Sequence, residues 1–361
     1  MPKPVDGTQA DDMPKDPKLS VRNLWKLYGP DPIGTTAGSF AQMPLDQKLS
    51  HARDAGHFVA AADVSFDVAE GEIFVIMGLS GSGKSTMLRC ISRLDDPTRG
   101  AVFLDGVDMM KANARQLIAF RRHKMGMVFQ DFGLLPHLDV VQNVAFPLKA
   151  QGRPREDREA VAVEMIELVG LTGKEGSYPH ELSGGQQQRV GIARSLAADP
   201  ELWFLDEPFS ALDPLIRNQM QNEFLRLQKQ LSKTIVFVTH DILEALKLAD
   251  RICIMKDGQV VQIGTPADIV LRPADAYVRE FIGDVPCANV LAAEDVMSPA
   301  HPDGKDHPQV PRHTILDEAI KLFDDTTVIV DVVDDQGTII GALHPLKVIR
   351  SLYHDAVVAD L

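Results

Sequence analysis

Residues 78–85 have the sequence GLSGSGKS, directly after an apolar run and directly before a helix-compatible segment. Glycines allow successive backbone N–H groups to point toward one centre, and the N-terminus of a following helix adds positive potential. A glycine-rich connecting turn is the alternative, but the flanking strand and helix favour a loop that binds the phosphates of a nucleoside triphosphate. Its candidate binding residues are Gly78, Ser80, Gly81, Ser82, Gly83, Lys84, Ser85 and Thr86. Lys84 would reach the β- and γ-phosphates, and the Ser85 hydroxyl would ligate Mg²⁺.

Two carboxylates end another apolar run, LWFLDE at residues 202–207. A carboxylate at the tip of a buried strand beside a phosphate loop can hold Mg²⁺ through water, and this is the role expected of Asp206. The adjacent Glu207 could accept a proton from an attacking water. Paired acids at a strand end also occur as exposed turn residues, so this motif alone leaves both interpretations open.

A third motif, LSGGQ at residues 182–186, gives the sequence its resemblance to a known family. With it the chain resembles the ATP-binding-cassette (ABC) ATPases, whose signature is LSGGQ. Further matches follow in the family's order: Gln130 at the Q-loop, SALD at residues 210–213 at the D-loop, and His240 at the switch histidine. The resemblance covers residues 18–283.

The resemblance implies catalytic roles for three residues. Glu207 would be the base that activates water, His240 would hold the γ-phosphate and orient that water, and Gln130 would sense the γ-phosphate and contact Mg²⁺. A lone histidine after a strand is more often structural, but its place among the other motifs favours function. Tyr28 lies where the family places an aromatic ring that stacks on adenine, although Trp25 or Tyr28 could be part of the core.

The resemblance also implies a homodimer that sandwiches two ATP molecules. The signature of one subunit would cap the γ-phosphate held by the phosphate loop of the other, so that ATP binding closes the dimer and hydrolysis opens it. A helix that begins with exposed N–H groups is a suitable anion site. The residues implied at this second nucleotide contact are Ser183, Gly184, Gly185, Gln186 and Asp213.

Short apolar runs that alternate with helical periodicity favour a parallel α/β sheet. The resemblance implies the α/β class of P-loop NTPases, with a RecA-like parallel sheet core, an antiparallel β subdomain and a helical signature subdomain. Residues 1–17 are expected to be a disordered polar tail without a secretion signal. An ATP-binding domain should follow at residues 18–283, with an insertion at about residues 30–57 that holds one short helix.

The chain changes character after residue 283, where prolines punctuate a polar stretch. Residues 284–312 are expected to be a linker and the start of a small α+β unit, which continues over residues 313–361. The motif DVMSP at residues 295–299 and the order that follows resemble the cystathionine-β-synthase (CBS) type regulatory repeat. Such repeats work in pairs and the chain has room for about one, so nucleotide binding, pairing with the other subunit's copy and a structural appendage stay open. The expected elements are a helix at 315–323, strands at 328–333 and 338–343, and a helix at 346–353.

Charge and composition exclude several classes of protein. The formal net charge of −14 argues against a nucleic-acid surface, and residues 285–361 alone hold thirteen acidic and five basic residues. No apolar run exceeds five residues, whereas a membrane helix needs about 18. Cys90, Cys253 and Cys287 lack metal-ligand spacing, which indicates a reducing compartment and no structural metal.

Other segments indicate a transporter. Residues 131–144 resemble the segment of importer ATPases that receives a coupling helix from the permease. The insertion and the runs at residues 71–83 and 209–217 resemble the glycine betaine/proline importer ATPases, which are ATP hydrolases. This implies a permease in the membrane, a periplasmic or extracellular substrate-binding protein, and a peripheral position on the cytoplasmic face of the inner membrane.

The substrate remains open among glycine betaine, proline betaine, choline, carnitine and trimethylamine N-oxide. An ABC ATPase for another substrate, or one in DNA maintenance or translation, is an alternative. A nucleotide-gated dimerisation module without transport is another.

Overall fold

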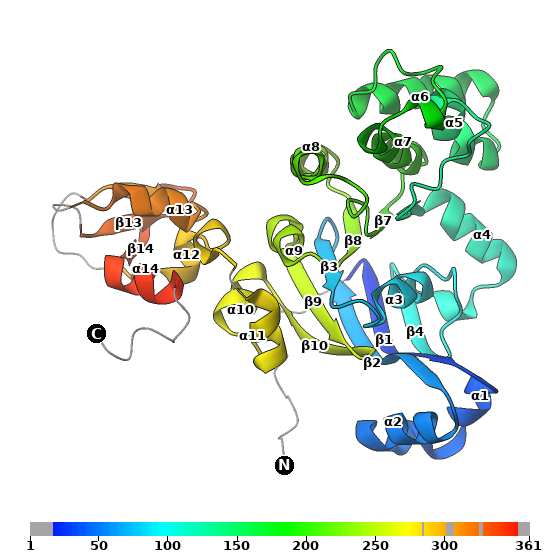
Figure 1. The fold of residues 1–361 in the computed structure, drawn as a ribbon, viewed down its shortest axis with the longest axis horizontal. Coiled ribbons are helices and arrows are strands. Elements are labelled where there is room, and N and C mark those ends of the chain that lie inside the picture. The colour runs from blue at the N-terminus through cyan, green and yellow to red at the C-terminus, as the bar shows by residue number, and fades with distance from the viewer. Residues whose placement is uncertain (1–16, 284, 301–306, 325–327, 353–361) are drawn as a thin grey trace. The chain divides into compact units, whose positions relative to one another are not determined.

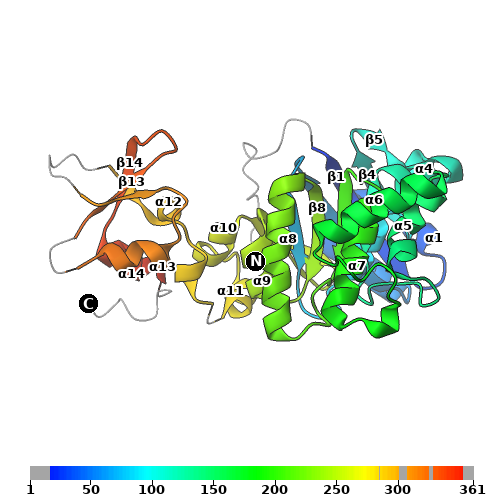
Figure 2. The same cartoon turned by 90° about the horizontal axis from the view of Figure 1, so that it is seen from above.

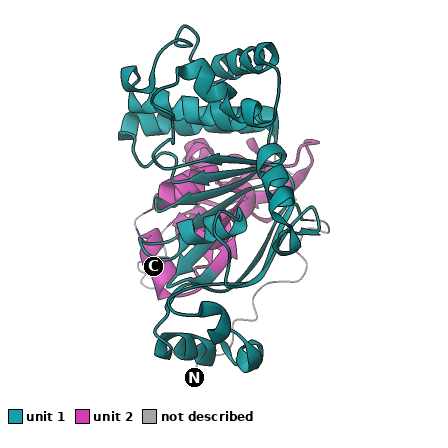
Figure 3. Ribbon diagram, turned by 90° about the vertical axis from the view of Figure 1, so that its right-hand side faces the viewer, with its two compact units in different colours: residues 1–241, 253–261 teal, residues 242–252, 262–361 magenta. Residues whose placement is uncertain are grey.

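The computed structural model describes residues 17–283, 285–300, 307–324 and 328–352. The chain forms two compact units, which are coloured separately in Figure 3: residues 1–241 with 253–261, and residues 242–252 with 262–361. The predicted polar tail lies outside the described residues except for Pro17, and so does the end of the predicted C-terminal unit, residues 353–361. Among the described residues, no helix combines the length and the hydropathy that crossing a lipid bilayer requires.

A six-stranded sheet with the order β10-β9-β3-β8-β7-β6 forms the core of the first unit. Strands β3, β8, β7 and β6 pair in parallel. Their apolar runs are buried, as expected of parallel strands that are covered on both faces. The predicted parallel α/β core is therefore confirmed. The strands are β3 (Ile73–Met77), β6 (Met125–Val128), β7 (Leu202–Asp206), β8 (Thr234–Thr239), β9 (Arg251–Lys256) and β10 (Gln259–Gly264).

Two helices flank the strands that carry the predicted chemistry. Helix α3 (Lys84–Ile91) follows β3 and buries its apolar side, and α8 (Pro214–Leu231) follows β7 (Figure 1). Phe224 of α8 packs against Trp203 of β7 and Phe237 of β8, with ring centroids 5.8 and 6.2 Å apart. This aromatic cluster ties α8 to β7 and β8.

An antiparallel sheet with the order β2-β1-β4-β5 forms the predicted β subdomain. The insertion expected at about residues 30–57 holds more than the one short helix predicted, because α1 and η1 precede α2. Phe40 of the insertion is buried edge-on against Trp25 at 5.1 Å, so the insertion shares the core of this sheet. The elements are β1 (Leu19–Tyr28), α1 (Pro32–Thr35), η1 (Gly38–Gln42), α2 (Leu45–Asp54), β2 (Phe58–Val68), β4 (Arg99–Leu104), β5 (Val107–Asp108) and η2 (Met109–Lys111).

Helices form the predicted signature subdomain. Both cartoon views show α5, α6 and α7 packed together, and Figure 1 shows them away from α3 (Figures 1 and 2). Helices α4, α5 and α7 each begin with a capping box, which satisfies their first backbone N–H groups. The elements are α4 (Ala114–His123), α5 (Val140–Ala150), α6 (Arg155–Leu168), η3 (Pro179–Glu181) and α7 (Gly184–Ala197).

The second unit contains a four-stranded sheet with the order β11-β14-β13-β12, in which β12 and β13 are parallel. The elements expected after residue 313 are present as α13, β13, β14 and α14. Two short strands, β11 and β12, lie in the proline-punctuated stretch before them. The elements are α9 (Ile242–Leu248), α10 (Pro266–Leu271), α11 (Ala276–Ile282), η4 (Cys287–Asn289), α12 (Ala293–Val296), β11 (Ser298–Pro299), β12 (Gln309–Pro311), α13 (Leu316–Ala319), η5 (Ile320–Leu322), β13 (Val330–Val333), β14 (Ile339–Leu343) and α14 (Pro345–Leu352).

A network of ion pairs connects four segments of the first unit. It consists of Lys18 before β1, Asp105 between β4 and β5, Lys124 after α4 and Glu201 before β7. Lys18 Nζ lies 2.8 Å from Asp105 and 2.6 Å from Glu201, and Lys124 Nζ lies 2.9 and 3.3 Å from the same two carboxylates. Burial acts to raise the pKa of Asp105, but the hydrogen bonds from the two lysines outweigh it and lower that pKa. The pKa of Lys18 is raised, because its bonds to Asp105 and Glu201 outweigh the opposing effect of burial.

These shifts predict a pH window for the stabilisation by this network. Asp105 contributes above its unfolded pKa near 3.8 and loses that contribution as the pH falls through its lower folded pKa. Lys18 contributes below its unfolded pKa of 10.5 and loses that contribution as the pH rises through its higher folded pKa. Because Asp105 is about a third exposed, we expect Asp105→Asn to lower the unfolding free energy by only about 1 kcal/mol at pH 7.

Urea unfolding at pH 7 and pH 3 measures this effect. The difference between Asp105→Asn and the parent should shrink at pH 3, which lies below the unfolded pKa of the carboxylate, because the contribution is lost as the pH falls toward the lower folded pKa. The exposed Glu167→Gln is the control and should cost little at either pH. A cost for Asp105→Asn that is equally large at pH 3 would contradict the electrostatic explanation.

Candidate functional site

The predicted phosphate loop, residues 78–83, connects β3 to α3. Gly83 has φ +99°, and a Cβ there would lie 2.1 Å from the Ala60 carbonyl oxygen. A Cβ at Gly78 would lie 2.3 Å from the Met255 carbonyl oxygen. Only glycine fits these two positions, because the loop passes close to neighbouring backbone. The loop therefore keeps its backbone N–H groups unshielded at the start of α3, where an anion binds well.

Lys84, the first residue of α3, lies under this loop. Its ammonium donates hydrogen bonds to the carbonyl oxygens of Gly78 at 2.8 Å and Leu79 at 3.1 Å. Burial lowers the pKa of Lys84, although the charges of Glu207 and Asp206 act in the opposite direction. The Ser82 hydroxyl is buried and has no hydrogen-bond partner among the described residues, whereas Ser80, Gly81 and Ser85 are exposed and Thr86 is half-buried.

Ser85, in the first turn of α3, meets Asp206, the last residue of β7, and the Ser85 hydroxyl donates to Asp206 Oδ1 at 3.0 Å. Burial raises the pKa of Asp206 and the Glu207 charge adds to this rise, while the Ser85 hydrogen bond opposes it. A hydroxyl beside a carboxylate is a pair of hard oxygen donors of the kind that Mg²⁺ prefers. The residues present therefore fit a magnesium ion that nucleotide phosphates would also coordinate.

Glu207 and His240 form a second pair beside the first. His240 Nδ1 lies 2.9 Å from Glu207 Oε2, and the tautomer of the ring decides which atom donates. Glu207 has φ +44°, a left-handed conformation that glutamate rarely adopts, and its N–H donates to the Val238 carbonyl oxygen of β8. The side chain of His240 is 53% exposed, whereas that of Glu207 is 16% exposed. The pair can accept a proton at Glu207 and contact a phosphate at His240.

Tyr28 and Trp25 have different environments. Trp25 is buried in the core, whereas Tyr28, at the end of β1, is 42% exposed. Its hydroxyl donates to Asp95 at 3.3 Å, and Lys26 Nζ lies 4.9 Å from the ring centroid. Burial and the Asp95 charge raise the pKa of Tyr28. Lys26 fixes the ring from one side, a role that sequence reasoning missed although Lys26 and Tyr28 lie on the same face of β1.

The signature motif begins α7. Ser183 caps this helix by accepting from Gln186 N–H at 3.3 Å, and Gln186 Oε1 accepts from Ser183 N–H at 3.0 Å. A Cβ at Gly185 would lie 2.8 Å from Ile216 of α8, and one at Gly184 would meet only ordinary contacts. Helix α7 packs against α5 and α6, and Figure 1 shows it away from α3, so the signature and the phosphate loop begin helices of two different subdomains.

The remaining candidates, Asp213 and Gln130, differ in their contacts. Asp213 caps α8 by accepting from Ile216 N–H at 3.1 Å. Gln130 is exposed in the turn after β6, and the structure brings no hydrogen-bond partner to it among the described residues. Sequence reasoning also missed Arg217, whose guanidinium donates to the Leu212 carbonyl oxygen and to Asp241, the residue after His240. The sequence did offer a signal for Arg217: it lies one helical turn after Asp213, the last residue of the SALD motif.

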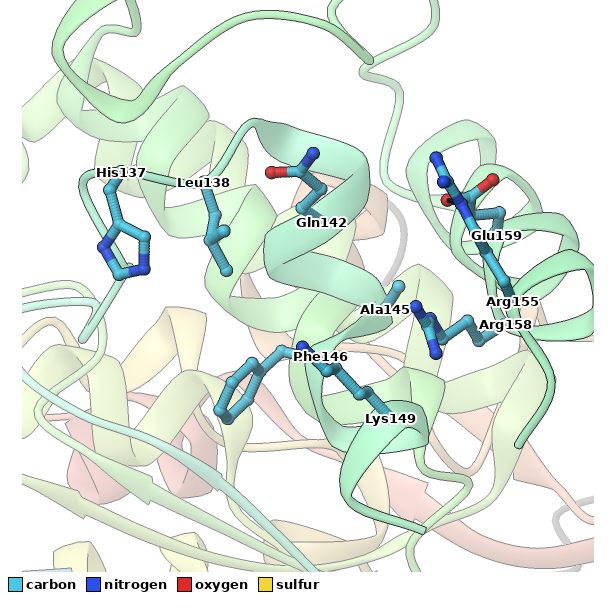
Figure 4. A pocket seen from close by; sticks show the side chains of 9 residues that line it. All are labelled: His137, Leu138, Gln142, Ala145, Phe146, Lys149, Arg155, Arg158 and Glu159. Carbon is cyan, nitrogen blue, oxygen red and sulfur yellow. Dashed lines mark hydrogen bonds and ion pairs between the residues drawn. The ribbon is translucent and has the colours of Figure 1, made fainter. Parts of the chain in front are cut away.

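A pocket of about 360 Å³ lies between α5 and α6, and its lining includes His137, Leu138 and Gln142 of the segment expected to meet the permease (Figure 4). Leu138 and Phe146 give it an apolar side, and Phe146 is 45% exposed. Within the part of the chain that the structure describes, neither Lys149 nor Arg158 forms an ion pair, whereas Arg155 pairs with Glu159 at 2.7 Å. The pocket therefore presents apolar surface beside cations that are not neutralised.

The fold and this site define an ATP-binding-cassette ATPase, and comparisons with known proteins agree. The family described as ABC transporter matches residues 61–210. The trimethylamine N-oxide transport system ATP-binding protein TmoW of Pelagibacter ubique is 49% identical over 94% of this chain and 98% of its own length. TmoW of Ruegeria pomeroyi is 52% identical over 91% of this chain and 94% of its own length.

Other relatives widen the comparison. The glycine betaine/proline betaine transport system ATP-binding protein ProV of Escherichia coli is 47% identical over 77% of this chain and 69% of its own length. The ATP-binding cassette MJ0796, solved as a dimer in a post-hydrolysis state bound to ADP and Pi, is 34% identical with a TM-score of 0.57, covering 69% of this chain and 98% of that one. The chain belongs to the ATP-binding subunits of ABC transporters, in the quaternary- and methylated-amine importer subfamily.

Proposed function

We propose that this ATPase powers the uptake of trimethylamine N-oxide through a separate permease. The proposal rests on how much of this chain each relative matches. The two trimethylamine N-oxide relatives match 94% and 91% of the chain, so the match must include most of the C-terminal unit, whereas ProV matches 77%. Glycine betaine, proline betaine, choline and carnitine are the related substrates that an experiment has to separate from it.

In the proposed mechanism two copies of the chain enclose two ATP molecules. The phosphate loop and Lys84 bind the phosphates of one nucleotide, while Ser183, Gly184, Gly185 and Gln186 of the other copy approach the same γ-phosphate. The position of α7 in a different subdomain from α3 supports this arrangement, in which the signature acts on the nucleotide of the other copy. Tyr28 stacks on adenine, and Asp213 lies at the dimer contact.

Glu207 accepts the proton of the attacking water, and His240 orients that water against the γ-phosphate. The 2.9 Å contact between Glu207 and His240 supports these two roles, because it holds the base beside the side chain that would contact the γ-phosphate. Ser85 and Asp206, with Gln130, would hold Mg²⁺. When bound, the ion neutralises charge on the phosphate oxygens.

The permease is proposed to dock on the pocket between α5 and α6. An apolar side with Leu138 and Phe146 suits a short helix, and the cations Lys149 and Arg158 suit acidic groups on it. The complex would lie on the cytoplasmic face of the inner membrane and receive substrate from an external binding protein. The C-terminal unit, with its resemblance to a CBS repeat, is proposed to pair with the copy in the other subunit.

ATPase measurements on the reconstituted transporter test the substrate. The chain, its permease and the binding protein are placed in liposomes, and phosphate release is followed with each amine. Trimethylamine N-oxide should raise the rate several-fold above the substrate-free rate. A stimulation by choline or glycine betaine alone would overturn the proposed substrate, and no turnover with any amine would favour a regulatory module without transport.

A further inference from the structure

Arg194 lies on α7 and makes two hydrogen bonds to a loop about sixty residues away in the sequence. One guanidinium nitrogen donates to the Gly133 carbonyl oxygen at 2.6 Å, and the other donates to the Phe132 carbonyl oxygen at 2.8 Å. This loop follows β6 and carries Gln130. The side chain therefore joins the signature helix directly to the turn that presents Gln130.

The turn held in this way has an unusual backbone. Phe132 has φ +57° and Gly133 has φ +59°, so that two successive residues are left-handed. Such a conformation is unfavourable for phenylalanine and needs support from its surroundings. It presents both carbonyl oxygens to the same guanidinium. The loop also lies against the backbone of α7, because a Cβ at Gly191 would be 3.5 Å from the Phe132 carbonyl oxygen.

The guanidinium of Arg194 is bound by backbone carbonyl oxygens and not by a carboxylate of the described residues. Burial lowers the pKa of its guanidinium, and among the described residues it forms no ion pair with a carboxylate. Two carbonyl dipoles are its hydrogen-bond partners. The side chain is half-buried, and its planar guanidinium bridges two adjacent acceptors, whereas a lysine ammonium lacks that rigid fork. The arrangement suits a rigid connection better than a simple stabilising contact.

We propose that Arg194 is a positioning residue that makes the Gln130 loop and the signature helix move as one body. Through it, the γ-phosphate contact made by Gln130 in one subunit sets the position of Ser183 for the nucleotide of the other. This inference rests on the proposed two-nucleotide dimer. Loss of the connection should weaken ATP-dependent dimerisation while leaving the binding of nucleotide to one chain unchanged.

The test uses the full chain with Glu207→Gln, which should hold ATP without hydrolysing it. Arg194→Lys is added to this parent, and Arg189→Lys is the matched control, since Arg189 lies on the same helix but contacts Val169 and Met220. Light scattering measures the dimer fraction against ATP concentration, and a fluorescent ATP analogue measures binding to the monomer. Arg194→Lys should raise the ATP concentration for half dimerisation by about tenfold, with monomer affinity within about twofold of the parent.

Each outcome has a separate meaning. Equal dimerisation of Arg194→Lys and Arg189→Lys would overturn the role of Arg194. A parent that stays monomeric at saturating ATP would instead overturn the proposed dimer mechanism on which the inference rests.

If Arg194→Lys does not fold, the proposal can still be tested by measuring amide hydrogen exchange in the Glu207→Gln parent as ATP is added. Residues 129–133 and 183–188 should gain protection at the same ATP concentration. Protection of one segment without the other would overturn the proposal.

Discussion

Glu207→Gln is expected to retain ATP binding and to slow ATP hydrolysis by about 10²-fold or more, the usual contribution of a positioned base. The amide has the size of the carboxylate and can keep the 2.9 Å contact with His240, but it cannot take the proton from water. Glu207 directly follows β7, and its backbone N–H donates to the Val238 carbonyl oxygen, so the backbone that carries the side chain is fixed. The geometry of the site should therefore survive the substitution.

Steady-state phosphate release and an equilibrium ATP titration separate these two effects. Glu164→Gln, an exposed change of the same kind on α6, serves as the control and should match the wild-type rate. Turnover of Glu207→Gln close to that of the control would show that another group accepts the proton. A loss of ATP binding in parallel would show instead that the substitution disturbs the site.

Lys84→Ala is expected to weaken ATP binding by about 10- to 100-fold, because a hydrogen bond to a charged group contributes about 1.5–3 kcal/mol. The ammonium is buried beneath the loop and already faces two carbonyl oxygens, so little rearrangement is needed for it to meet phosphate oxygens. Its removal also leaves a cavity at the first turn of α3. The effect should therefore fall on binding rather than on the catalytic step alone.

Calorimetric titration with ATP measures this affinity, and thermal unfolding checks that the variant is folded. Lys111→Ala provides a matched control, since the side chain of Lys111 is 85% exposed and pairs with Asp108. An unchanged affinity in a folded Lys84→Ala protein would refute the assignment of Lys84 to the phosphates.

Several elements could be predicted because their signals are local. Strands β3, β7 and β8 are uninterrupted apolar runs, and α7 begins at a serine whose side chain caps the helix. The short helix expected in the insertion is present as α2. By contrast, α1 and η1 have weak local signals, and Phe40 is held by its contact with Trp25 across the subdomain. Burial against distant residues decided that part of the fold.

The C-terminal unit shows the same limit. Strands β13 and β14 have apolar runs that identify them, whereas β11 and β12 have only two and three residues in a proline-rich stretch. They are strands because β14 and β13 supply hydrogen-bond partners, through the register Ser298 to Ala342 and Gln309 to Asp331. No local propensity could have distinguished them from a linker.

The sequence by itself determined which chemistry is present: a glycine loop with a lysine, paired acids at a strand end, and a signature that caps a helix. These features depend on backbone conformations within a few residues. Only the tertiary structure decided which groups meet. Ser85 reaches Asp206 across 121 positions because β3 and β7 end at the same edge of one sheet, and Arg194 reaches Phe132 because α7 packs against the loop after β6. Such pairings follow from strand order and helix packing, which no single segment encodes.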